Sequence, residues 1–123
     1  MKTYEEVVKY LKSYKEFEFN VEYYRNKMNG LKSISYSLEE KSTVQNNMTS
    51  IYMEKIDESQ NKMLEIEKFI ENNFVGQERF AIWEKYILKM QNKEISASMG
   101  FSNGYAHQFI KKALIRYVEK HIQ

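Results

Sequence analysis

Seven polar side chains lie close together in the sequence, between residues 102 and 112 of this 123-residue chain. Asparagine and glutamine can each form two hydrogen bonds with the edge of an adenine, and lysine ammonium groups pair with phosphates. Histidine, serine and tyrosine can add contacts to bases, sugars or phosphates. These residue types predict recognition of double-stranded DNA. The candidate DNA-binding residues are Ser102, Asn103, Tyr105, His107, Gln108, Lys111 and Lys112.

The surrounding segment, KEISASMGFSNGYAHQFIKKAL, has the pattern of a helix-turn-helix. Ile95 and Met99 would give a short first helix its apolar face, and Gly100 suits the left-handed backbone of the turn. Ser102 is the expected N-cap of the second helix. That helix would turn inward Ala106, Phe109, Ile110, Ala113, Leu114 and Tyr117. The candidate residues then lie on its outer face, which is the face that enters a major groove in recognition helices.

The same spacing also fits a small three-helix bundle with a glycine turn and no role in DNA binding. On that interpretation His107 is an ordinary surface histidine, and Tyr105 packs half-buried against its neighbours. Gly104 weakens the predicted second helix by about 1 kcal/mol relative to alanine.

The segment from Tyr86 to Leu114 resembles the C-terminal helix-turn-helix of region-four-type domains in bacterial sigma factors. The family pattern combines an apolar helix, a polar turn, Glu-Ile-Ala, a Leu-Gly-Tyr-Ser turn and a basic helix closing on Lys-Ala-Leu. Residues that match or substitute conservatively are Tyr86, Glu94, Ile95, Met99, Gly100, Phe101, Ser102, Lys112, Ala113 and Leu114. The chain departs from the pattern at Ser96, where the family has alanine, at Ala106, where it has a larger β-branched residue, and in the arginine-free turn Asn103-Gly104-Tyr105.

The N-terminal stretch VVKYLKSYKEFEFNVEYYRNKM is similar to phage-encoded transcriptional regulators of the RinA/ArpU type. Those proteins also place a helical region ahead of a sigma-like domain. The resemblance implies an activator of phage late genes that acts with host RNA polymerase in the cytoplasm of the bacterial host cell. The missing arginines argue against a sigma-like promoter preference. They also favour an alternative, in which a sigma-like module binds polymerase or another regulator without reading DNA.

The chain as a whole is expected to be all-α, because it has no proline and four glycines. Apolar residues recur every three or four positions from Tyr4 to about Met28, and Asn29 and Gly30 predict the helix end. A second long helix is expected from about Ser50 to Asn72, after a Ser/Thr/Asn-rich connector over 31–49. Shorter helices are expected over 77–90, 93–99 and 103–121. We therefore expect a helical hairpin over 1–75 and a helix-turn-helix domain over 76–123.

The charge is divided unevenly between these two parts. Residues 1–76 hold 11 basic and 13 acidic side chains, whereas residues 77–123 hold 8 basic and 4 acidic ones. A positive C-terminal part suits a polyanionic partner. The first helix carries Tyr10, Tyr14, Tyr23 and Tyr24, more than one helical face can bury. These rings predict either homo-oligomerisation or a polymerase contact through the N-terminal helices, or simple packing on the second helix.

The sequence suggests no catalytic, cofactor or metal site. It contains no cysteine and two histidines, and its clustered carboxylates alternate with lysines as they do on solvated helix faces. We expect no enzyme activity. No apolar run approaches the roughly 18 residues that a membrane helix needs, and the N-terminus lacks a signal peptide, so a cytoplasmic protein without a membrane partner is expected.

Overall fold

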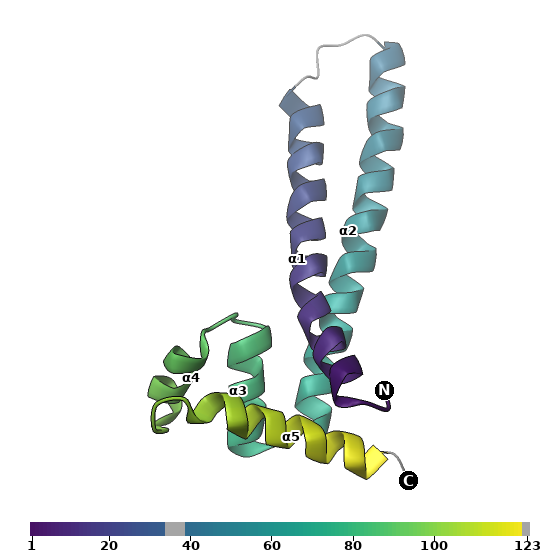
Figure 1. Cartoon of the computed structure of the whole chain (residues 1–123). Coiled ribbons are helices and arrows are strands. Elements are labelled where there is room, and N and C mark those ends of the chain that lie inside the picture. The colour runs from purple at the N-terminus through teal and green to yellow at the C-terminus, as the bar shows by residue number, and fades with distance from the viewer. Residues whose placement is uncertain (34–38, 122–123) are drawn as a thin grey trace. The chain divides into compact units, whose positions relative to one another are not determined.

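The computed structural model describes the backbone of residues 1–33 and 39–121, and the side chains of residues 1–30 and 47–121. These residues form α-helices joined by turns, with no strand among them (Figure 1). The helices are α1 (Tyr4–Ser33), α2 (Glu39–Asn73), α3 (Gly76–Tyr86), α4 (Asn92–Met99) and α5 (Tyr105–His121). The predicted all-α fold, with two long helices followed by three shorter ones, is confirmed.

Helix α1 begins where the sequence predicted but ends later. The Thr3 Oγ1 accepts a hydrogen bond of 3.2 Å from the backbone N–H of Glu6, as an N-cap residue does. The predicted stop at Asn29 and Gly30 is wrong, because the helix continues to Ser33. A single glycine lowers helix stability by about 1 kcal/mol, which does not by itself end a helix of this length.

Helix α2 begins at Glu39, well before the predicted start near Ser50. The predicted connector over 31–49 is therefore wrong for residues 31–33 and 39–49, which are helical, while residues 34–38 lie outside the described residues. The low helix propensity of serine, threonine and asparagine is a weak preference that a long cooperative helix overrides.

The chain divides into two compact units, which we describe separately. The first unit contains Met1–Lys15 together with Leu64–Gln123, and the second contains Glu16–Met63. The first unit thus combines the beginning of α1 and the end of α2 with α3, α4 and α5.

The first unit has one apolar core to which all five helices contribute. Val7 and Leu11 of α1 are fully buried there. Aromatic contacts extend the core, since the Phe69 ring lies 5.2 Å from that of Tyr10 and 5.1 Å from that of Tyr117. Other buried members are Ile66, Ile70, Phe74, Ile82, Ile95, Ile110 and Leu114. The first turns of α1 are therefore built into the same unit as α5.

Helix α3 buries only one of its three aromatic side chains, Tyr86. Ala81, Ile82 and Tyr86 point into the core, whereas Trp83 is half-buried and Phe80 is exposed. Tyr86 is therefore a core residue, and Trp83 is not fully enclosed by the core. Residues 82 and 86 share one side of a helix, and residues 80 and 83 fall outside that side.

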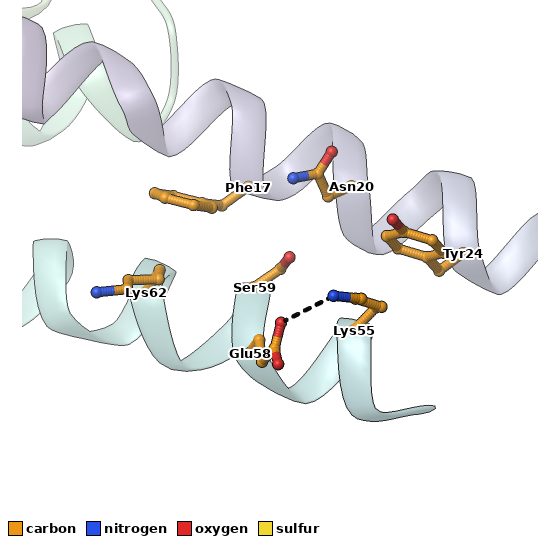
Figure 2. Close-up of a pocket in the computed structure, with 7 residues that line it drawn as sticks. All are labelled: Phe17, Asn20, Tyr24, Lys55, Glu58, Ser59 and Lys62. Carbon is orange, nitrogen blue, oxygen red and sulfur yellow. Dashed lines mark ion pairs between the residues drawn. The ribbon is translucent and has the colours of Figure 1, made fainter. Parts of the chain in front are cut away.

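In the second unit, α1 and α2 run in opposite directions (Figure 1). Val21 and Ile56 are buried, and the rings of Tyr24 and Tyr52 lie 5.8 Å apart. Ser59, in the middle of the polar stretch 57–62, is also buried. Figure 2 shows Ser59 beside a cavity of about 360 Å³ lined by Phe17, Asn20, Tyr24, Lys55, Glu58, Ser59 and Lys62.

Over the described part of the chain, no helix has both the length and the apolar character that crossing a bilayer requires.

Candidate nucleic-acid interface

The turn between α4 and α5 has the geometry that the sequence predicted at Gly100. This glycine adopts φ 71° and ψ 23°, in the left-handed region. The backbone N–H of Phe101 donates to the carbonyl of Ser96 at 2.8 Å, and the N–H of Gly100 donates to the carbonyl of Ala97 at 3.3 Å. This pair of bonds is a Schellman motif, which ends α4 and turns the chain away from the helix axis.

The predicted N-cap role of Ser102 is wrong, because α5 begins three residues after it, at Tyr105. The carbonyl of Ser102 accepts a hydrogen bond of 3.1 Å from the N–H of Tyr105, so Ser102 opens the turn that leads into the helix. Gly104 stands just before the helix with φ 82°. The expected cost of Gly104 inside a helix therefore does not arise, since its left-handed backbone is one that glycine adopts most readily.

Ser96 performs the role that was assigned to Ser102. Its side chain is 2% exposed, and its Oγ accepts a hydrogen bond of 3.1 Å from the backbone N–H of Ala106 in the first turn of α5. A helix N-terminus has N–H groups without partners in the helix, and a buried one needs such an acceptor. In the sequence, Ser96 differs from the sigma family's alanine, and no capping role was predicted for it. A polar residue on the predicted inner face of α4 was the sequence feature that indicated such a role.

Hydrogen bonds between side chains and neighbouring helices fix α4 against α3. The Ser98 Oγ donates to Glu84 Oε1 at 2.8 Å, and the Lys85 Nζ donates to Asn92 Oδ1 at 3.1 Å. The carboxylate of Glu94 accepts a bond of 3.3 Å from the N–H of Gln91 and so steadies the start of α4. Helix α4 is thus anchored to α3 before α5 begins.

The inner face of α5 agrees with the prediction. Ala106, Ile110, Ala113 and Leu114 are buried, while Phe109 and Tyr117 are half-buried. The ring of Phe109 lies 4.9 Å from that of Phe101, so the turn residue packs against the helix it precedes. This contact, with the Ser96 hydrogen bond, orients the first turns of α5.

All seven predicted residues are exposed, five on the outer face of α5 and two on the turn before it. They are Ser102, Asn103, Tyr105, His107, Gln108, Lys111 and Lys112. Tyr105 also packs edge-to-face on Phe101 at 5.2 Å, so it combines an exposed ring with a fixed position. The structure brings the seven residues together on the turn and the first half of α5.

Two basic residues of α5 make contacts that the sequence did not predict. The Lys111 Nζ lies 5.8 Å from the ring centroid of Tyr4, within the range of a cation–π interaction. The guanidinium of Arg116 pairs with Glu78 of α3, and its Nε donates to the carbonyl of Lys112. Arg116 is therefore committed to an intramolecular ion pair, and Tyr4 stands beside the basic face of α5.

The arrangement is suited to binding. In the described ranges 1–30 and 47–121, no three histidine, aspartate or glutamate side chains gather as metal ligands would. The outer face of α5 offers hydrogen-bonding groups and cations on a rigid helix. Those are the groups that recognise base edges and phosphates. Comparison with protein-family models, with curated proteins and with solved structures found no match to this chain.

Proposed function

We propose that this protein binds specific sequences of double-stranded DNA through α5 and regulates transcription. The observation that carries the proposal is the division of α5 into two faces. One face is packed into the core of the first unit, and the other exposes five of the seven polar candidates. The other two, Ser102 and Asn103, are exposed on the turn that leads into α5. The first turns of α5 would enter the major groove, with Asn103 and Gln108 at adenine edges and Lys111 and Lys112 at phosphates.

The resemblance to sigma region four and to RinA/ArpU-type regulators extends the proposal. It makes this protein an activator of phage late genes that acts with host RNA polymerase in the cytoplasm of the infected bacterium. Activation requires a contact with polymerase as well as with DNA. Exposed aromatic side chains outside α5 are suited to that second contact.

The DNA-binding proposal is tested by selecting bound fragments from a random pool of duplexes. We expect a preferred sequence to emerge, and the double change Lys111→Ala with Lys112→Ala to weaken binding to it. The matched control is Lys27→Ala with Lys68→Ala, which removes two exposed lysines from α1 and α2. If the α5 variant bound the selected sequence as tightly as the parent, α5 would not be the DNA-binding face.

A second function, protein binding without DNA recognition, is favoured by one observation in the second unit. Phe19 is 64% exposed and Tyr23 is 45% exposed, although both are large and apolar, and their rings stack 6.3 Å apart. Exposed aromatic pairs are common where proteins associate. This surface would serve a second copy of the chain or polymerase.

Salt distinguishes the two functions. Binding through phosphates weakens steeply between low and physiological salt, because counterions are released from DNA. Binding through Phe19 and Tyr23 would change little with salt and would be lost in Phe19→Ser with Tyr23→Ser. Sedimentation of the parent and of that variant would show whether the partner is a second copy of this chain.

A further inference from the structure

A concave site on the first unit is lined by four lysines, a tyrosine and a methionine. Its volume is about 330 Å³, and its lining residues are Lys12 and Lys15 of α1 and Lys85, Tyr86, Lys89 and Met90 at and after the end of α3. We call it the lysine pocket. Its lining contains no carboxylate.

One lysine of the pocket, Lys85, lies in an environment that disfavours its positive charge. Lys85 is half-buried, and its Nζ is hydrogen-bonded to a neutral oxygen, Oδ1 of Asn92. Burial, and then the nearby charge of Lys12, lower the pKa of Lys85 below its usual value. The ammonium groups of Lys12 and Lys85 therefore repel each other beside the cavity, and a bound anion would reduce that repulsion.

The backbone conformation at Lys89 also supports a functional role for the lysine pocket. The Lys89 φ of 58° lies in the left-handed region, which is unfavourable for residues with a side chain other than asparagine and aspartate. Glycine or asparagine would follow α3 here with less strain. The lysine instead contributes a cation to the pocket lining, as expected where strain is tolerated at a functional site.

Tyr4 connects the lysine pocket to the proposed DNA face. The Lys111 Nζ of α5 lies over the Tyr4 ring at 5.8 Å. Tyr4 also lies close enough to Tyr86 for its charge to help raise the pKa of Tyr86, an effect that comes first from burial. Tyr86 in turn lines the pocket. A path of neighbouring side chains therefore runs from the basic face of α5 to the four lysines.

We propose that the lysine pocket binds a backbone phosphate of the DNA duplex held on α5, outside the base pairs that α5 reads. The inference rests on the proposed DNA-binding function. A lysine ammonium is a point charge with freely rotating donors, so it binds phosphate without reading sequence. Four of the six lining residues carry ammonium groups, and Tyr86 is buried, which favours a backbone phosphate over a small nucleotide.

The test compares three proteins on the duplex selected from the random pool. The pocket variant carries Lys12→Gln, Lys15→Gln and Lys89→Asn, and it retains Lys85 because of its hydrogen bond to Asn92. Asparagine tolerates the left-handed backbone at position 89, so the variant is expected to fold. The control variant carries Lys27→Gln and Lys68→Gln. Affinity is measured from low to physiological salt, and phosphate contacts are mapped by ethylation interference.

We expect the slope of log affinity against log salt to fall by about 1 to 2 in the pocket variant, since each phosphate contact contributes about 0.9. Its preference for the selected sequence over a scrambled one should remain as in the parent, and interference at phosphates flanking that sequence should disappear. The control variant should keep the parental slope.

Other outcomes overturn the inference in distinguishable ways. An unchanged slope, with binding still lost in Lys111→Ala with Lys112→Ala, would leave DNA binding by α5 in place and remove the pocket from it. A parent that bound no duplex would overturn the proposed function and the inference together. Tripolyphosphate binding by that parent, lost in the pocket variant, would reassign the pocket to a small phosphorylated ligand.

Discussion

The Oγ of Ser96 in α4 accepts a hydrogen bond of 3.1 Å from the backbone N–H of Ala106 in α5, in a buried environment. The two residues lie on different helices, and the bond joins them across the turn at Gly100. It satisfies a donor that the helix itself leaves without a partner. The same bond holds the first turn of α5, which carries three of the seven proposed DNA contacts, Tyr105, His107 and Gln108.

Ser96→Ala is expected to destabilise the protein by about 1 to 2 kcal/mol, because the N–H of Ala106 would remain buried without an acceptor. Urea unfolding followed by circular dichroism measures the change. Ser102→Ala is the matched control, since Ser102 is exposed and its carbonyl, not its side chain, bonds to Tyr105. Equal losses in the two variants would contradict the assignment of Ser96 as the capping residue.

Gly100→Ala is expected to lower the free energy of unfolding by about 1 kcal/mol or more, because its φ of 71° is unfavourable for alanine. A Cβ built at this position meets no atom within 4 Å, so the loss would come from the backbone alone. Gly100→Asn should lose less, because asparagine tolerates this region better. Thermal unfolding of both variants checks the order, and an alanine variant as stable as the parent would exclude strain at this turn.

Alkaline pH is expected to destabilise the protein through Tyr86. Burial, and then the charge of Tyr4, raise the pKa of Tyr86 to about 12 from its usual 10.0. The folded protein then binds more protons than the unfolded chain between these values, so stability is intact below pH 10 and falls as pH rises toward 12. The full effect is about 3 kcal/mol.

Lys85, in contact with Tyr86, acts in the opposite direction, because its lowered pKa makes stability rise with pH as the folded protein loses that proton. Tyr86→Phe isolates the tyrosine contribution, since it leaves Lys85 in place. Unfolding by urea at a series of pH values should show a steeper loss above pH 10 in the parent than in Tyr86→Phe. Parallel curves for the two proteins would contradict the prediction.

Ser59→Leu is expected to stabilise the second unit by about 1 kcal/mol. Ser59 is buried beside a cavity of about 360 Å³, and added apolar surface there would be removed from water (Figure 2). Gln60→Leu, on the exposed side of the same helix, should give no gain. Thermal midpoints of the two variants provide the comparison. A loss of stability in Ser59→Leu would mean that the cavity cannot accept the larger side chain.

Gln108→Ala is expected to relax the sequence preference of the proposed DNA complex. A glutamine bound to adenine by two hydrogen bonds contributes about 1 to 3 kcal/mol of discrimination at one base pair. Lys112→Ala should instead weaken binding to all duplexes similarly and reduce the salt slope by about 1. Competition between the selected sequence and single-base variants of it separates the two effects. A Gln108→Ala protein with unchanged preference at every position would remove Gln108 from the base contacts.

The sequence predicted α4 and α5 well because each is short, has an apolar face with clear spacing and is bounded by a polar turn. Ile95, Ile110 and Leu114 all lie where that spacing placed them. Helix α3 was predicted over 77–90 but ends at Tyr86. The early start of α2 at Glu39 was missed, since serine- and asparagine-rich segments read as loops when the stability of the neighbouring helix is not considered.

The candidate DNA face was predictable because it lies on one helix and one turn, where residue spacing determines direction. The lysine pocket was not predictable from the sequence. Lys12 and Lys85 are far apart in the sequence, and only the packing of α1 beside α3 brings them to one cavity. Ser96 was missed for the same reason, because its partner Ala106 belongs to another helix.

The beginning of α1, as far as Lys15, belongs to the first unit, and this has a practical consequence. Val7 and Leu11 are fully buried there, and Tyr4 touches Lys111. A minimal version of the first unit, which carries the proposed DNA-binding face, therefore cannot be obtained by a single truncation. It needs Lys15 joined to Leu64 by a short engineered loop. That change removes the second unit, Glu16–Met63, and keeps the segments of α1 and α2 that belong to the first unit.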